Sequence, residues 1–295
     1  MQVDATYLVQ LTLNGLVLGL IYALTAAGLA LVFGVLEIIN FAHGELLMVG
    51  AYVMAFAVPA FHGLYIPAMA VAIIASALLG IVLYDGFLVR LREKDFERSI
   101  LLTMGLSMVL LYGCQYLFTS TPMMVSTQLG IEGVQIGSIR ITWTRIVACA
   151  IAVAAFGALW FILNRTQFGR AMRAVALNRE AALMVGIRPR TVARHAVVVA
   201  SVLAGLAGAA IAPVQIVQPG MGQFLIFKAF ALVIIGGLGS MGGAIVAGLA
   251  LGIVENWIGG FFDIIWQETA AFLAMIAVLL LKPHGLFGRA RMRVG

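Results

Sequence analysis

Uncharged, mostly apolar stretches fill most of this chain, and short polar or basic segments separate them. A helix rises about 1.5 Å per residue, so crossing the roughly 30 Å hydrocarbon core of a bilayer takes about 20 residues. Stretches near this length are predicted to form transmembrane helices. They run from Leu8 to Phe33, Glu45 to Phe61, Ile66 to Val89, Ser99 to Phe118, Trp143 to Leu163, Ala196 to Val217, and Thr269 to Leu281 with its preceding turn.

A longer apolar region from Phe224 to Gly260 contains the glycine-rich sequence GGLGSMGG at positions 236–243. The pieces before and after it, of about 12 and about 17 residues, are each short for a full crossing. We therefore expect a discontinuous helix pair here. Altogether the pattern predicts an all-α, polytopic membrane protein. It would be one transmembrane domain over residues 1–295, with about eight transmembrane helices plus discontinuous or re-entrant segments.

Composition agrees with this prediction and excludes a soluble domain. Of the 295 residues, 63% are hydrophobic and only 10% are charged, whereas a soluble domain has roughly 25% charged residues. The first apolar stretch has no Lys or Arg before it and is longer than the core of a secretory signal, so we expect it to remain as a membrane helix. Cys114 and Cys149 have neither metal-ligand nor redox spacing, and no metal site is predicted.

Arginine is concentrated in one segment, residues 164–195. Seven arginines lie between Arg165 and Arg194, against one acid, Glu180. Positively charged loops between membrane helices favour the cytoplasm, so we interpret this segment as a cytoplasmic loop. No nucleic-acid-binding fold accompanies it, and a nucleic-acid partner is not expected. The basic segments at 90–98 and 282–295 are expected on the same side, which makes the C-terminus cytoplasmic.

The number of crossings between these basic segments must then be even. The predicted helices at 196–217 and 269–281 satisfy this condition alone, so the region 224–260 is expected to enter and leave the membrane on one side. The same reasoning places residues 34–44 nearer the cytoplasm and Met1 outside, although the first 89 residues contain no Lys or Arg to orient them.

Two interruptions follow similar apolar text. EIINFAHG at 37–44 follows LALVFGV, and GGLGSMGG at 236–243 overlaps the end of FALVIIGG. Matching interruptions in two halves of a chain indicate an internal repeat with a site near the membrane midplane, and unwound backbone at membrane depth is tolerated only inside protein or beside a water-filled cavity. The residues predicted to line a translocation path are Asn40, His43, Glu45, Gly236, Gly237, Gly239 and Gly242.

Patterns associated with enzymes are absent or out of context. Gly237, Gly239 and Gly242 have the spacing of a dinucleotide-binding fingerprint, but that fingerprint requires a strand, a turn and a helix in a soluble unit. The sequence has no P-loop and no plausible grouping of Ser, His and an acid. We therefore predict no catalytic residues and no cofactor bound by this chain.

The arginine-rich loop contains a different motif. Apolar and basic residues alternate over 169–187 as in a short amphipathic helix, and Pro189 follows. An interfacial helix would show this pattern too, but the segment also has the spacing E-A-A-x-x-x-G. That spacing resembles the coupling motif of ABC-importer permeases, whose short helix docks into a groove of the ATPase and needs an apolar face and a turning glycine. The coupling residues implied are Arg170, Arg173, Glu180, Ala181, Ala182 and Gly186.

Four segments in order extend this resemblance to nearly the whole chain. They are INFAHGELLMVGAY (39–52), GRAMRAVALNREAALMVGI (169–187), KAFALVIIGGLGSMGGAIVAGLALGIVE (228–255) and KPHGLFGR (282–289). Together they resemble the permease family of branched-chain amino acid ABC importers, the Liv type. The chain departs from the family pattern at Arg179, where proline is common, and in the loop from Thr119 to Thr144.

The resemblance implies a non-catalytic permease subunit in a bacterial inner membrane. Its implied partners are a second related permease or a second copy of this chain, two cytoplasmic ATPases that bind the ATP, and a periplasmic substrate-binding protein. Branched-chain amino acids are the implied cargo, and urea, amides or other amino acids are alternatives within the family. A proton-coupled carrier or a channel is the alternative from another class, because it would also explain broken helices and an acid within the membrane.

Two roles are open for Asn40 and His43: they bind backbone groups freed by the break, or they offer polar contacts to a zwitterion in transit. On a helix, Glu45 points about 200° away from His43, so its partner lies elsewhere. Lys228 is one candidate, and the alternative is that Lys228 extends to the outer interface. The glycines at 236–243 either line the path or permit close helix contact.

Overall fold

A computed structural model describes residues 5–91, 96–118, 120–130 and 132–288. Helices make up most of it, as predicted, and one two-stranded hairpin, which the sequence pattern did not predict, lies between residues 119 and 144. The elements are α1 (Ala5–Leu36), α2 (His43–Ala60), α3 (Tyr65–Gly86), the 3₁₀-helix η1 (Leu88–Arg90), α4 (Phe96–Phe118), β1 (Gly133–Ile136), β2 (Ile139–Thr142), α5 (Trp143–Arg165), α6 (Gln167–Leu177), α7 (Arg179–Met184), α8 (Pro189–Ile211), α9 (Met221–Gly236), α10 (Met241–Phe261) and α11 (Ile264–Leu281).

Seven of the described helices are long and apolar enough to cross a membrane: α1, α2, α3 together with η1, α4, α5, α8 and α10. α9 and α11 are apolar but shorter. The polytopic all-α class is therefore confirmed, whereas the count of about eight spans and the internal repeat stay predictions. α8 begins at Pro189 rather than at Ala196, because proline fits the first turn of a helix, where its missing N–H has no helical partner.

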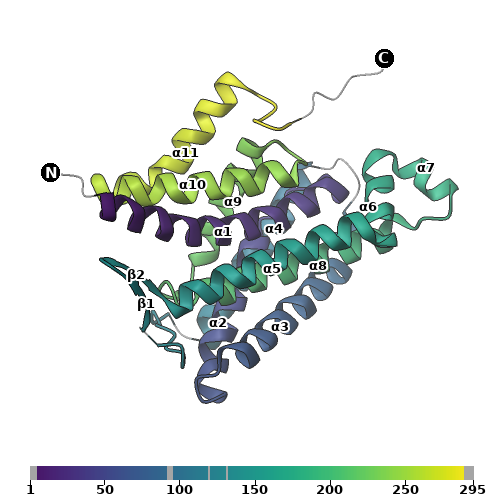
Figure 1. Cartoon of the computed structure of the whole chain (residues 1–295). Helices are drawn as coiled ribbons and strands as arrows, with labels where there is room; N and C mark the ends of the chain where they lie inside the picture. The colour runs from purple at the N-terminus through teal and green to yellow at the C-terminus, as the bar shows by residue number, and fades with distance from the viewer. Residues whose placement is uncertain (1–4, 92–95, 119, 131, 289–295) are drawn as a thin grey trace.

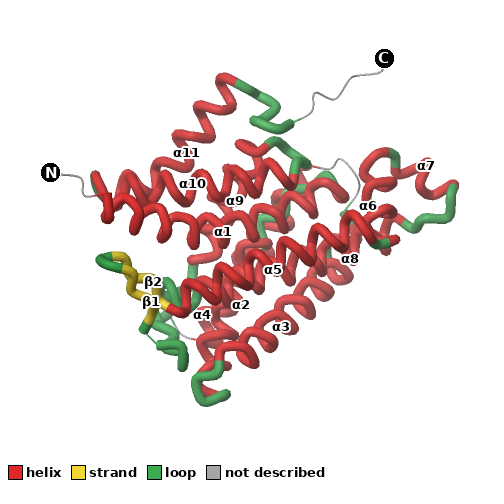
Figure 2. Tube along the Cα trace, viewed as in Figure 1, coloured by secondary structure: helices red, strands yellow, loops and turns green. Residues whose placement is uncertain are grey.

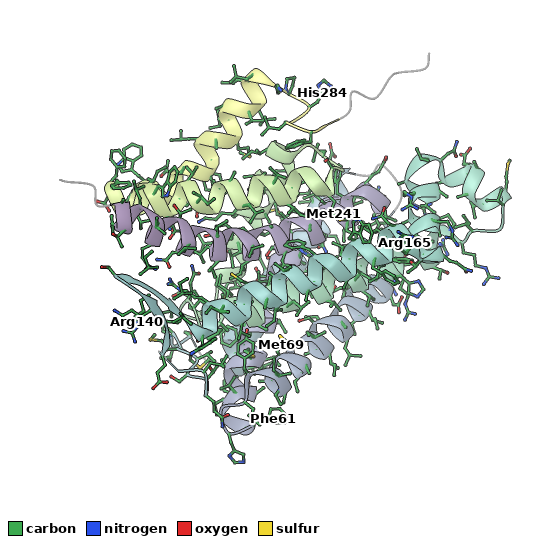
Figure 3. All side chains as sticks on the ribbon, viewed as in Figure 1. Phe61, Met69, Arg140, Arg165, Met241 and His284 are labelled. Carbon is green, nitrogen blue, oxygen red and sulfur yellow. The ribbon has the colours of Figure 1, made fainter. Side chains whose placement is uncertain are left out.

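The two ends of the bundle differ (Figure 1). α6 and α7 protrude from one end, which we call the coupling end, and the β1–β2 hairpin lies at the opposite end, the hairpin end. α1, α5, α8 and α10 extend between them, and many of the connecting loops collect at these two ends (Figure 2). Arg165 lies toward the coupling end and Arg140 toward the hairpin end (Figure 3).

α1 is a central helix, and α10 lies antiparallel along it. A Cβ built at Gly15 would lie only 2.6 Å from the Cα of Ile253, so the two backbones touch there. Helices in lipid gain little from excluding water, and close approach of small residues supplies packing instead. Near the ends of the same pair, the Tyr7 hydroxyl donates to the carbonyl oxygen of Gly260 at 3.1 Å. α10 therefore reaches the hairpin end.

The length of α10 corrects one part of the expected discontinuous helix pair. α10 has 21 residues and spans the bundle, so the piece after the glycines is not short. The region 224–260 still enters and leaves at the same end of the bundle, as expected. α9 runs toward the coupling end, α10 returns to the hairpin end, and α11 runs back. The C-terminal segment then meets the end of α9, where the Leu286 amide donates to the carbonyl oxygen of Ile235 at 2.8 Å. Four helices thus follow the arginine-rich loop and bring the chain back to the coupling end, and the number of membrane crossings among them stays a prediction.

Basic residues from separate segments meet at the coupling end. Arg90, Arg179 and Arg190 line one cavity of about 640 Å³ between η1, α7 and α8. The described parts of the basic segments therefore share one end of the bundle, as the sequence predicts. The parts of these predictions that concern Met1, residues 92–95 and residues 289–295 lie outside the described residues.

Candidate functional site

The first interruption, residues 37–42, runs back into the bundle rather than across its end. α1 ends at Leu36, and Glu37 reverses the chain with a φ of 54°. α2 begins at His43, whose Nε2 lies 3.3 Å from the carbonyl oxygen of Thr25. Thr25 precedes Leu36 by 11 residues, which is about 16 Å along a helix. Unwound backbone therefore lies deep within the bundle.

Side chains around this break bind its backbone groups. The side-chain oxygen of Asn40 accepts a hydrogen bond from the Ala42 amide at 3.1 Å. The Thr103 hydroxyl of α4 lies 3.2 Å from the carbonyl oxygen of Ile39 and 2.8 Å from that of Ser99, so these two acceptors compete for its one proton. Asn40 and His43 are each only 1% exposed. The Asn40 contact fits the structural role, because freed backbone groups need partners where water is excluded. Asn40 Nδ2 and His43 Nδ1 are buried without a hydrogen-bond partner among the described residues, so both roles stay open for these residues.

Glu45 faces away from His43, toward α4 and α9. Its Oε1 accepts from the Ser107 hydroxyl at 2.9 Å, and its Oε2 has no hydrogen-bond partner among the residues that the structure describes. A Cβ built at Gly222 would lie 2.7 Å from that oxygen. The predicted pairing of Glu45 with Lys228 is wrong, because α9 presents Gly222 to Glu45 and Lys228 lies six residues, or about 9 Å, further along the helix.

Lys228 instead forms an ion pair inside the bundle. Its Nζ lies 3.0 Å from Glu255 Oε2 of α10 and 3.3 Å from the Tyr22 hydroxyl of α1. The Tyr22 hydroxyl also contacts Glu255 Oε2, as its donor, at 3.1 Å. The Lys228 side chain is 12% exposed and that of Glu255 is 0% exposed. The alternative in which Lys228 extends to the outer interface is therefore also wrong.

Sequence reasoning missed Tyr22 and Glu255 as members of this network. A signal was present, because Lys228 is the single charged residue of α9 and Glu255 is the single charged residue of α10. Ionisable residues within apolar membrane segments are costly and usually pair with one another. Two lone, opposite charges on neighbouring apolar helices could therefore have been paired from the sequence.

The predicted path residues lie in two separate places, and those of the glycine-rich turn between α9 and α10 form one of the two groups. A Cβ built at Gly236 would lie 2.3 Å from the backbone of α10, and one at Gly237 would lie 2.5 Å from the backbone of the C-terminal segment, so both permit close packing. Gly239, with a φ of 82°, lines a cavity of about 640 Å³. No described atom lies within 4 Å of a Cβ at Gly242. This turn lies at the coupling end, whereas Asn40, His43 and Glu45 are buried deeper in the bundle.

The arginine-rich loop folds into two short helices at the coupling end. α6 buries Met172 and Val175 and exposes Arg170 and Arg173, as an amphipathic helix does. The Asn178 side chain then caps α7 by accepting from the Ala181 amide at 3.0 Å. The single helix expected here is therefore two helices, because a capping residue interrupts the pattern.

α7 carries the E-A-A-x-x-x-G motif. Glu180 and Ala181 are exposed and Ala182 is buried, and Gly186 ends the helix with a φ of 82°, a conformation that favours glycine. Three successive apolar side chains after the motif alanines are exposed. They are Leu183 at 55%, Met184 at 89% and Val185 at 74%. An apolar surface therefore protrudes at the tip of the coupling end.

These features define a class of protein, the polytopic membrane transport subunit. The bundle has helices of membrane-spanning length, with one interruption buried inside it. A second interruption and a protruding amphipathic loop lie together at one end. Comparisons with known proteins identify the family within this class.

A family model described as "Branched-chain amino acid transport system / permease component" matches residues 11–281. The high-affinity branched-chain amino acid transport system permease protein BraD of Pseudomonas aeruginosa is 29% identical, over 96% of each chain. The corresponding permease protein LivH of Escherichia coli is 28% identical, also over 96% of each chain. A probable branched-chain amino acid transport permease protein LivH of Methanocaldococcus jannaschii is 26% identical, over 90% of this chain and 88% of its own. No solved structure matches.

The chain therefore belongs to the family of branched-chain amino acid transport system permease components. It is a multi-pass membrane permease, and its relatives are transport subunits rather than enzymes.

Proposed function

We propose that this chain provides the translocation path of an ABC importer for branched-chain amino acids, with the coupling end in the cytoplasm. Two ATPase subunits would dock there and bind the ATP, a periplasmic binding protein would deliver the cargo at the hairpin end, and a second permease, related or identical, would complete the path. The described basic residues lie together at the coupling end, and this arrangement supports the proposed orientation.

The observation that carries the proposal is the exposed tip of α7. Leu183 and Met184 are largely exposed at the end of a helix of only six residues, and so is Val185, which follows it. Apolar side chains exposed together at a protruding tip indicate a protein contact, and a helix lying in an apolar groove is a recurring mode of recognition. α6 anchors this tip, since it packs Met172 and Val175 against the membrane helices. A movement of α7 would therefore be transmitted through α6 to the membrane helices.

Replacement of Gly186 by arginine tests the ATPase contact. A non-glycine residue at this positive φ is strained, and the new charge would project beside the apolar tip, so we expect the ATPases to be lost from the purified complex. Gly137→Arg is the matched control: Gly137 also has a positive φ and open space around its Cβ, but it lies in the hairpin at the other end.

Pull-down from native membranes measures the outcome. The proposal requires that the unmodified chain and Gly137→Arg recover two ATPases, while Gly186→Arg recovers none at unchanged permease abundance. Full recovery and uptake with Gly186→Arg would contradict the docking of α7. Transport by the isolated chain in a proton gradient would contradict the importer proposal and favour a proton-coupled carrier. Binding of amino acids, amides or urea to the copurified binding protein would identify the cargo.

A further inference from the structure

The ion pair between Lys228 and Glu255 lies inside the bundle, and Glu255 is six residues, or about 9 Å, from the end of α10 at the hairpin end. Tyr22 precedes the coupling end of α1 by 14 residues, and Glu255 follows the coupling end of α10 by 14 residues. Both distances are about 21 Å. The network therefore lies within the depth of a bilayer, where ionisable groups are rare and mark either structural pairs or paths for polar cargo.

The hydrogen-bonding capacity of this pair is not used up. Lys228 has three donors, and two of them reach Tyr22 and Glu255 Oε2. Glu255 Oε1 is buried and has no partner in the described ranges. Apolar residues of similar volume often stabilise a fold as well as a buried ion pair does. An ion pair that served stability alone would therefore be expected to satisfy both carboxylate oxygens. The open acceptor and donor fit a further ligand with both charges.

One face of α9 leaves the Lys228 side of the pair partly exposed, with the Glu255 carboxylate buried behind it. α9 packs against α1, α2, α10 and α11, and its remaining face exposes Phe224 by 60% and Phe227 by 45%. Lys228 follows Phe224 by one helical turn and borders this face. The ring of Phe227 also lies 6.4 Å from that of Phe41, which belongs to the first interruption. Aromatic rings and the edge of an ion pair therefore lie together beside the unwound segment.

We propose that Lys228 and Glu255 form a transient contact site for the charged groups of an α-amino acid during its passage. The Lys228 ammonium would bind the carboxylate of the cargo, Glu255 Oε1 would accept from its α-ammonium, and the rings of Phe224, Phe227 and Phe41 would contact its apolar side chain. The two charges of the pair match the two charges of a zwitterion, and partners already present keep the site weak enough to release its cargo. This assignment rests on the proposed function, and it adds the groups that recognise the amino acid.

The test uses the whole complex in liposomes with the amino-acid-loaded binding protein. Stimulated ATP hydrolysis and leucine uptake are first measured with the unmodified chain, and absence of both would contradict the proposed function itself. The informative variant is K228M/E255Q, which removes both charges and leaves neither unpaired. We expect it to retain at least half of the stimulated ATP hydrolysis and to lose uptake at least tenfold. Uptake that falls only in proportion to ATP hydrolysis would show that the pair merely joins helices, and would overturn the proposal.

A second measurement does not depend on the folding of that double variant. Phe227→Cys is placed in a chain whose Cys114 and Cys149 are alanine, and its reaction with a small, positively charged thiol reagent is followed in the complex. Val153→Cys on α5, which is 61% exposed, is the matched control for a residue that faces lipid. We expect fast labelling at position 227 that slows with loaded binding protein, and slow labelling at 153. Equal, slow labelling at both positions would overturn the proposal.

Discussion

Glycine residues decide how closely the helices approach one another at the first interruption. A Cβ built at Gly44 would lie 2.2 Å from the carbonyl oxygen of Gly222, and one at Gly222 would lie 2.6 Å from the carbonyl oxygen of Gly44. α2 and α9 therefore touch through their backbones at the start of both helices. The carboxylate of Glu45 is held at this same crossing, between Ser107 and Gly222.

At the scale of one residue, Gly44→Ala is expected to destabilise the folded chain by about 1–3 kcal/mol, because the added methyl group requires the two backbones to separate. Gly113→Ala is the matched control, since a Cβ at this helical position of α4 has open space. Alanine is preferred to glycine within a helix, so the control should be neutral or slightly stabilising. Thermal unfolding of the purified proteins measures the difference, and equal midpoints would contradict the close crossing.

The helical elements differ in how much of each one the rest of the bundle covers. α1 has 78% of its most apolar window buried, whereas α4 and α5 each have 22% buried. The central α1 and the peripheral α5 have similar mean hydropathy, 2.4 and 2.6, so this difference in position is not visible in their apolar composition. The coupling loop differs again, because α7 is a six-residue helix that depends on its cap and on Gly186 rather than on burial.

At the scale of an element, Asn178→Ala is expected to remove the cap of α7 and to destabilise that helix by about 1 kcal/mol. The membrane helices do not depend on this contact, so permease abundance should stay unchanged while ATP hydrolysis stimulated by the binding protein falls severalfold. Asn164→Ala is the control, because Asn164 is exposed and its side chain bonds only the preceding turn of α5. If both variants behave alike, the cap does not control coupling.

The whole molecule is organised so that the chain returns, after the arginine-rich loop, to the end of the bundle where that loop lies. α8, α9, α10 and α11 return the chain to the coupling end, where residues 282–288 contact the end of α9. Arg90, Arg179 and Arg190 meet at that end, and the positive-inside rule is the basis for the proposed cytoplasmic position of the coupling end.

At the scale of the whole molecule, single cysteines introduced into a chain without Cys114 and Cys149 should report this topology. Met184→Cys and His284→Cys, which are both exposed at the coupling end, are expected to react with an impermeant thiol reagent only in inside-out vesicles. Gly137→Cys in the hairpin should react only in right-side-out vesicles. Labelling of positions 184 and 284 from opposite sides would mean that the number of passes between them is odd.

The sequence by itself determined the membrane class and most helices, because apolar length is a local property. Lys228 as a candidate partner of Glu45 failed, and so did the expectation of a short helix after the glycines. Only the tertiary structure decided these, since the rotation of α9 and the path of α10 along α1 depend on contacts between small residues far apart in the chain. The same contacts bring Lys228, Glu255 and Tyr22 together, which no local pattern specifies.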